Sequence, residues 1–175
     1  MSRIRITGGD WRSRLIEVAD AHGLRPTPDR VRETLFNWLG QDVTGLRCLD
    51  LFAGSGVLGF EAASRGAAQV TFVENNRLAF KQLQSNAMLF NDARLQLISG
   101  DAVHFKPATD YDLIFLDPPY RQDLLEQIEP RLPELASSNA RVYAEAESEL
   151  KRLGEWRVVK QGKAGQVFYH LLERD

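Results

Sequence analysis

The sequence predicts an α/β domain, with a mostly parallel sheet, helices on both of its faces and a C-terminal antiparallel hairpin. From residue 46 onward, short apolar runs alternate with amphipathic stretches, which is typical of βα units around a parallel sheet. The run at 111–116 is apolar throughout its centre, which is typical of a strand that helices cover on both sides. Together these patterns predict seven strands.

Each element is expected in chain order from its pattern and its boundary residues. A helix at 29–39 has Thr27 as its expected cap and Pro28 in its first turn. A helix at 122–129 should end where Pro130 and Pro133 interrupt it. The other expected elements are strands at 46–52, 69–74, 94–99, 111–116 and 141–145, helices at 57–65 and 76–90, and a hairpin over 156–160 and 166–172.

The composition fits one soluble domain in a reducing compartment. The chain has 175 residues, of which 43% are hydrophobic and 26% charged. Cys48 is the single cysteine and cannot form an internal disulfide, and three scattered histidines give no metal-ligand spacing. No apolar run approaches the roughly 20 residues that span a bilayer. We therefore expect a cytoplasmic protein that has neither a metal site nor a membrane anchor.

Positive charge is concentrated at the N-terminus. The whole chain carries a net charge of −2, yet residues 1–36 hold seven arginines against five acids, a net of 7 − 5 = +2. Arginines bind phosphates bidentately and an indole can stack on bases, so this segment is a candidate nucleic-acid surface. The alternative is a solvated arm whose arginines pair with local acids. We expect an extension at 1–25 and a catalytic domain at 26–175, with RNA contacts from Arg3, Arg5, Trp11, Arg12, Arg14, Arg25, Arg30 and Arg32.

A glycine loop follows the strand at 46–52 and opens the next helix. Gly54, Gly56 and Gly59 fit the dinucleotide-binding pattern, and Glu74 stands twenty residues after Gly54, where a ribose-binding acid is expected. A nicotinamide-dependent or flavin-dependent oxidoreductase is therefore one possible interpretation. Three acids at the ends of successive strands favour a different interpretation.

Asp50, Glu74 and Asp101 place a carboxylate at the end of each of the first three parallel strands. Three acids would repel a pyrophosphate, whereas a sulfonium cofactor offers an ammonium, a ribose and an adenine to them. Taken singly, each acid could only cap a helix or face solvent. As a set they predict three contact regions: Asp50, Phe52, Ala53, Gly54, Ser55 and Gly56 for the methionine moiety, Glu74 for the ribose, and Asp101 and Ala102 for the adenine.

The turn Asp117-Pro118-Pro119-Tyr120 follows the strand at 111–116. Asp117 contributes a carboxylate, and the prolines contribute carbonyls without competing N–H donors. A planar base could lie on Tyr120 while its amino group donates to Asp117 and a proline carbonyl. The alternative is an ordinary turn at a strand end with a surface tyrosine.

These motifs carry a family resemblance. The stretch 50–56 and the turn at 117–120 resemble class I S-adenosylmethionine-dependent methyltransferases that act on amino groups. The stretches 3–12 and 24–37 resemble the RsmD family of bacterial 16S ribosomal RNA guanine-N2 methyltransferases, and the similarity continues through 165–167. The resemblance implies a Rossmann-like fold, S-adenosylmethionine as cofactor, 16S rRNA as partner, and a target guanine extruded against Asp117, Pro118, Pro119 and Tyr120.

The residues leave several alternatives open. An aspartate in the turn serves an adenine N6 amine as well as a guanine N2 amine, and other amino groups share the same chemistry. An RNA-binding module without catalysis is a further alternative. The short N-terminal extension favours an assembled small-subunit particle as substrate over naked RNA, and we expect a monomer. The position of the modified guanine does not follow from the sequence.

Overall fold

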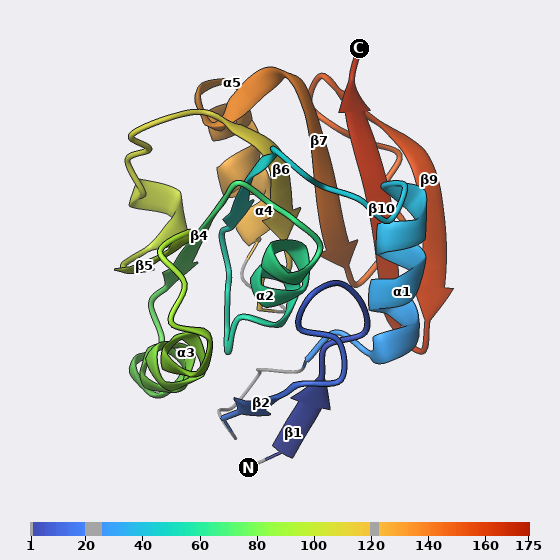
Figure 1. Cartoon of the computed structure of the whole chain (residues 1–175). Helices are drawn as coiled ribbons and strands as arrows, with labels where there is room; N and C mark the ends of the chain where they lie inside the picture. The colour runs from blue at the N-terminus through green and yellow to red at the C-terminus, as the bar shows by residue number, and fades with distance from the viewer. Residues whose placement is uncertain (1, 20–25, 120–122) are drawn as a thin grey trace.

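The structure, a computed structural model, describes residues 2–19, 26–119 and 123–175. Its elements form three layers, with one sheet between two groups of helices (Figure 1). The α/β class expected from the alternating pattern is confirmed. Within the described ranges, no helix is long and apolar enough to cross a membrane.

Eight strands form the central sheet, in the order β5-β4-β3-β6-β7-β10-β9-β8. The first five of these in the chain are parallel, and β10 runs antiparallel to both β7 and β9. The expected C-terminal hairpin is therefore present. The strands are β3 (Arg47–Asp50), β4 (Gln69–Glu74), β5 (Leu95–Ser99), β6 (Tyr111–Leu116), β7 (Ala136–Ala146), β8 (Arg152–Leu153), β9 (Trp156–Ala164) and β10 (Val167–Arg174).

The strand order changes direction between β3 and β6. From β3 the chain proceeds to β4 and β5 on one side, and it then crosses back to place β6 and β7 on the other side. The carboxyl ends of neighbouring strands separate at such a switch point and leave a crevice where ligands bind. The acids at the ends of β3 and β4 and the turn after β6 are therefore brought to one edge of the sheet.

Side chains of β6 show how the sheet is buried on both faces. Leu113 and Phe115 belong to one apolar cluster and Ile114 and Leu116 to the other, as the alternation of a strand requires. Three helices pack on the first face and two on the second. They are α1 (Asp29–Trp38), α2 (Val57–Ser64) and α3 (Arg77–Phe90) on one side, and α4 (Leu124–Ile128) and α5 (Leu132–Leu135) on the other.

The N-terminal segment forms a small antiparallel hairpin that lies against helices α2 and α3 (Figure 1). Its strands are β1 (Ser2–Arg5) and β2 (Leu15–Val18). Asn86 of α3 fastens β2, because its Oδ1 accepts the Glu17 N–H at 3.0 Å and its Nδ2 donates to the Glu17 carbonyl at 2.8 Å. The same Nδ2 donates to the carbonyl of Ser55 at 3.0 Å, so the hairpin and the glycine loop share one anchor.

Two strand assignments differ from the sequence expectation. The sheet has eight strands rather than seven, because β8 pairs with β9 around a tight turn in which Gly154 has a φ of 63°. A two-residue strand is too short to produce a periodic pattern. β7 begins at Ala136 rather than at 141. Its first residues include the polar run 137–139, which lacks the apolar pattern by which a strand is recognised in the sequence.

Candidate active site

A cavity of about 490 Å³ opens at the carboxyl ends of the parallel strands. The segment 26–28 and the turn between β9 and β10 complete its wall. The structure therefore brings together most of the residues predicted for cofactor and catalysis. Those on the wall are Asp50, Phe52, Ala53, Gly54, Ser55, Glu74, Asp101, Ala102, Asp117, Pro118 and Pro119.

The loop between β3 and α2 turns around two glycines that have positive φ, 58° at Gly54 and 94° at Gly56. A Cβ built on Gly54 would meet no atom within 4 Å, whereas one on Gly56 would lie 2.4 Å from Phe60. Gly54 thus leaves open space beside the cavity. Gly56 was predicted to contact the cofactor, but it is not on the cavity wall and instead lets the loop pack closely on α2.

Asp50 ends β3 and is fully buried. Its Oδ2 accepts the backbone N–H of Gly59 at 3.0 Å. Burial raises the pKa of Asp50 to about 7, the Gly59 N–H opposes that rise, and the Glu74 and Glu145 carboxylates add to it. A cation placed beside Asp50 would favour the ionised carboxylate, so the site is suited to a positively charged ligand group.

Glu74 and Asp101 both hold nearby backbone groups. Glu74 accepts the N–H of Gly54 on Oε1 and that of Asn76 on Oε2, each at 2.7 Å. Asp101 accepts the N–H of Val103 at 2.9 Å, and this bond, followed by one with His104, lowers the pKa of Asp101. An ionised carboxylate keeps further lone pairs, so both can still accept from hydroxyl or amino groups in the cavity.

Asp117 follows β6 and lies half-buried on the wall beside the two prolines. Burial raises the pKa of Asp117 well above its ordinary range, and the carboxylates of Glu145 and Asp50 add to that rise. Tyr120, the predicted stacking ring, lies outside the described residues. The turn therefore presents a carboxyl group of raised basicity next to proline carbonyls.

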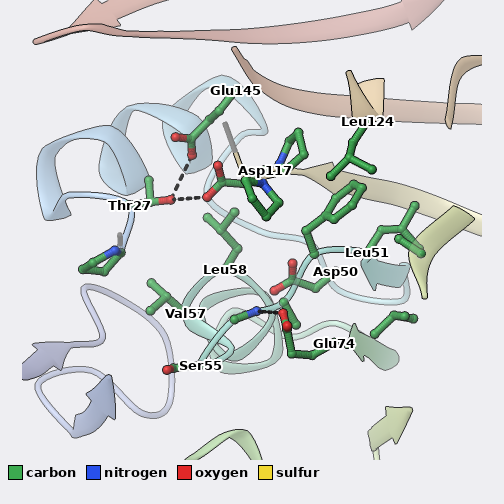
Figure 2. A pocket seen from close by; sticks show the side chains of 18 of the residues that line it. Thr27, Asp50, Leu51, Ser55, Val57, Leu58, Glu74, Asp117, Leu124 and Glu145 are labelled. Carbon is green, nitrogen blue, oxygen red and sulfur yellow. Dashed lines mark hydrogen bonds between the residues drawn. The ribbon is translucent and has the colours of Figure 1, made fainter. Parts of the chain in front are cut away.

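Sequence reasoning missed a polar cluster that shares the cavity with Asp117. Glu145 accepts the hydroxyl of Thr27 at 2.9 Å (Figure 2) and that of Tyr143 at 2.8 Å. The Thr27 hydroxyl also lies 3.4 Å from Asp117 Oδ2. The signal that could have found Glu145 is its position at the carboxyl end of a parallel strand beside β6.

Thr27 does not cap α1 as the sequence suggested. The residue at the cap position is Pro28, and the helix start has no side-chain cap. The reason is that the Thr27 hydroxyl, which is buried, donates to Glu145 instead. A residue expected to serve local structure is thus part of the site.

Comparison with known proteins identifies the family. The family model described as conserved hypothetical protein 95 matches residues 4–173. The ribosomal RNA small subunit methyltransferase D of Escherichia coli is 41% identical, over 99% of this chain and 91% of its own. The protein of the same name from Haemophilus influenzae is 39% identical, over 97% of this chain and 93% of its own. This chain belongs to the RsmD family.

Solved structures agree with RsmD membership. The yhhF structure of Escherichia coli, described as a methyltransferase, has a TM-score of 0.88 and 40% identity over 99% of both chains. An RNA methyltransferase of Salinibacter ruber in complex with S-adenosylhomocysteine has a TM-score of 0.70 at 19% identity, covers 86% of this chain and 94% of its own, and shows the shared fold. Membership makes this protein a methyltransferase and sets aside the oxidoreductase interpretation.

The predicted RNA-binding arginines of this RsmD-family chain fall into distinct groups. Arg5, Arg12 and Arg30 are exposed, and their side chains make no hydrogen bond or ion pair with the residues that the structure describes. Arg3 lies 3.8 Å from Glu17, and the Arg14 guanidinium lies 4.5 Å from the centre of the Phe90 ring. Arg25 is outside the described residues.

Two of the residues predicted to contact RNA have partners inside the domain: Arg32 is buried and Trp11 is half-buried. Arg32 is 1% exposed and is enclosed by hydrogen bonds to the Thr27 and Arg5 carbonyls and to Glu61. Trp11 stacks on Phe90 with ring centres 4.0 Å apart, and the Arg94 guanidinium lies over the same indole. Both side chains therefore attach the hairpin to the domain and are not free for RNA.

Proposed function

We propose that this protein transfers a methyl group from S-adenosylmethionine to the exocyclic N2 amine of a guanine in 16S ribosomal RNA. The observation that carries the proposal is that the Asp117-Pro118-Pro119 turn and the acid-lined glycine loop form walls of one cavity. The names of the Escherichia coli and Haemophilus influenzae relatives support small-subunit ribosomal RNA as the substrate.

The cavity fits S-adenosylmethionine in size and in donor set. Its volume lies within the range of about 300–1,000 Å³ that is usual for small-molecule sites. Asp50 would pair with the ammonium, Glu74 would accept from the ribose hydroxyls, and Asp101 with Ala102 would hold the adenine. The open space beside Gly54 leaves room for the methionine moiety. The complex of the Salinibacter ruber neighbour supports this class of cofactor.

The cofactor, when bound, supplies a methyl group that its positive sulfonium makes electrophilic. The protein's task is to make a poor nucleophile reactive, because the lone pair of a guanine amine is delocalised into the ring. Hydrogen bonds from the amine to Asp117 and to the Pro118 carbonyl would favour a pyramidal nitrogen. The raised pKa of Asp117 makes its carboxylate a stronger proton acceptor than an ordinary aspartate, which suits it to take up the proton that the amine loses.

The N-terminal hairpin and the start of α1 provide the RNA surface in this proposal. Arg5, Arg12 and Arg30 are exposed and would bind phosphates. Arg3, Arg14 and Arg25 would contribute further contacts, although the Arg14 guanidinium already donates to the Leu89 carbonyl at 3.0 Å. Residues 26–28, which precede α1, line the cavity, so the path from the phosphate contacts to the turn is short. The target guanine would be extruded into the cavity and lie on Tyr120.

We expect the substrate to be an assembled small-subunit particle in the cytoplasm, with the enzyme acting as a monomer. Among the arginines of the described hairpin, Arg5 and Arg12 are the two whose side chains make no hydrogen bond or ion pair with the described residues. Few phosphate contacts give weak binding to naked RNA, and proteins of the particle would supply the remaining contacts.

Methyl transfer from labelled S-adenosylmethionine tests the proposal. Small-subunit particles from a strain that lacks the protein serve as substrate, and the modified nucleoside is identified by mass spectrometry. We expect N2-methylguanosine at a single position. Label that appears only on adenine N6 or on protein would refute the proposal. A thermal-shift control should show stabilisation by S-adenosylhomocysteine and none by NAD(P).

A further inference from the structure

Glu145 is a cavity carboxylate to which the methyl-transfer chemistry above assigns no role. It lies near the end of β7, which pairs in parallel with β6 so that Leu116 is opposite Ala144. Asp117 and Glu145 each follow one of these two paired residues. The sheet register therefore places two carboxylates at adjacent strand ends, and both line the cavity.

The hydrogen bonds that Glu145 makes with the described residues all involve one of its two oxygens. The hydroxyls of Thr27 and Tyr143 both donate to Oε2, at 2.9 and 2.8 Å. Oε1 accepts no hydrogen bond from the described residues, and it is not among their fully buried unsatisfied polar atoms. Since Glu145 is on the cavity wall and only 6% exposed, Oε1 is an acceptor available to a ligand in the cavity.

A guanine edge carries the complementary groups. Its N2 amine and its ring N1–H are neighbouring donors, so they can meet two neighbouring carboxylates. Adenine has a lone pair at N1 beside its N6 amine, and a carboxylate would repel that lone pair. A site built to accept a particular N–H rejects bases that lack it, because the buried acceptor then stays unpaired.

We propose that Glu145 selects guanine over adenine, with its Oε1 accepting the ring N1–H while the N2 amine lies at Asp117. This role rests on the proposed guanine methylation and adds the residue that discriminates between bases. Thr27 and Tyr143 are positioning residues, because they fix Oε2 and thereby orient Oε1. The two donors of guanine would also relieve the repulsion between the two carboxylates.

The base analogue 2-aminopurine distinguishes the contribution of the N2 amine from that of the N1–H, since it keeps the N2 amine but has a lone pair at N1. The analogue replaces the target guanine in small-subunit particles reconstituted with synthetic RNA, once mapping has located that guanine. We expect the wild-type kcat/KM for 2-aminopurine to be lower than that for guanine by roughly 100-fold. Equal values would overturn the role of Glu145. This comparison needs no variant to fold.

Glu145→Gln tests the residue itself. Its amide can keep an oxygen toward Thr27 and Tyr143 while its NH₂ donates to an N1 lone pair. We expect the guanine to 2-aminopurine ratio to fall by at least about tenfold, while S-adenosylhomocysteine binding is unchanged. Glu147→Gln is the matched control, because it makes the same change from carboxylate to amide at an exposed residue that does not line the cavity, and its ratio should stay near that of the wild type.

Three results would contradict the proposal or its basis. A Glu145→Gln enzyme with an unchanged ratio would overturn the role of Glu145 alone. A Glu147→Gln enzyme whose ratio falls as far would show that the preference does not depend on the carboxylate of Glu145 in particular. A wild-type enzyme that methylates no guanine would refute the proposed function, and the inference with it.

Discussion

Arg32 and Glu61 form a buried ion pair, with Nη1 2.8 Å from Oε1 and side chains only 1% and 0% exposed. Arg32 also donates to the carbonyls of Thr27 and Arg5, at 3.1 and 2.8 Å. Glu61 accepts the backbone N–H of Thr7 at 3.0 Å. This pair therefore joins the N-terminal hairpin, the cavity segment at 26–28 and helix α2.

Glu61→Gln should destabilise the protein by about 3–5 kcal/mol, because it removes the buried carboxylate that pairs with both Arg32 and Arg65. Arg32 would then keep only the largely exposed carboxylate of Asp29 as an ion-pair partner among the described residues. Chemical denaturation followed by circular dichroism measures the change. Arg157→Gln is the control, since Arg157 and Glu173 form an exposed pair 3.9 Å apart whose loss should cost less than about 1 kcal/mol. Similar losses for the two variants would contradict the anchoring role of Arg32 and Glu61.

Asp50 should make the protein less stable as the pH rises. Its pKa of about 7 in the folded protein lies above the ordinary value of about 4, so the folded state holds the proton more tightly. Its contribution to the unfolding free energy is therefore fully present below about pH 4 and is lost as the pH rises through about 7.

Asp50→Asn provides the comparison, because the amide does not titrate and its oxygen can still accept the Gly59 N–H. Denaturation curves at several pH values between about 4 and about 8 should show wild-type stability falling relative to the variant as the pH rises. A difference that stays constant across this window would show that the folded-state pKa of Asp50 is not raised.

Arg12→Gln should weaken binding to ribosomal RNA and reduce the slope of log affinity against log salt by about 1, as expected for one lost phosphate contact. Arg157→Gln serves again as control, since Arg157 lies at the start of β9 and pairs with Glu173 and Asp175 near the C-terminus. Filter binding over a range of ionic strengths gives both slopes. Unchanged affinity of Arg12→Gln at every salt concentration would favour a solvated arm.

The sequence alone predicted the parts of the structure that depend on local pattern. Strand and helix periodicity located the parallel sheet, and the acids at strand ends, such as Asp50 and Glu74, follow from chain direction within that sheet. All three strand-end acids and the described part of the Asp117 turn line one cavity. Position relative to a strand end was therefore sufficient to find them.

Contacts between distant segments could not be predicted in this way. Arg32 looked like its exposed neighbour Arg30, and only the packing of α1 against Glu61 on α2 shows that it is buried. Thr27 and Glu145 lie 118 residues apart in the chain, so no local pattern connects them. Burial and partner choice depend on tertiary structure, and these residues were therefore misassigned or missed.

In the proposed mechanism, Asp117 activates an amine beside a cofactor that the acids of the same cavity hold. The direct measurement is methyl transfer by Asp117→Ala to small-subunit particles, with S-adenosylhomocysteine binding measured by calorimetry on the same preparation. We predict a loss of turnover of at least about 100-fold with cofactor affinity retained. Turnover at the wild-type rate would contradict this role of Asp117.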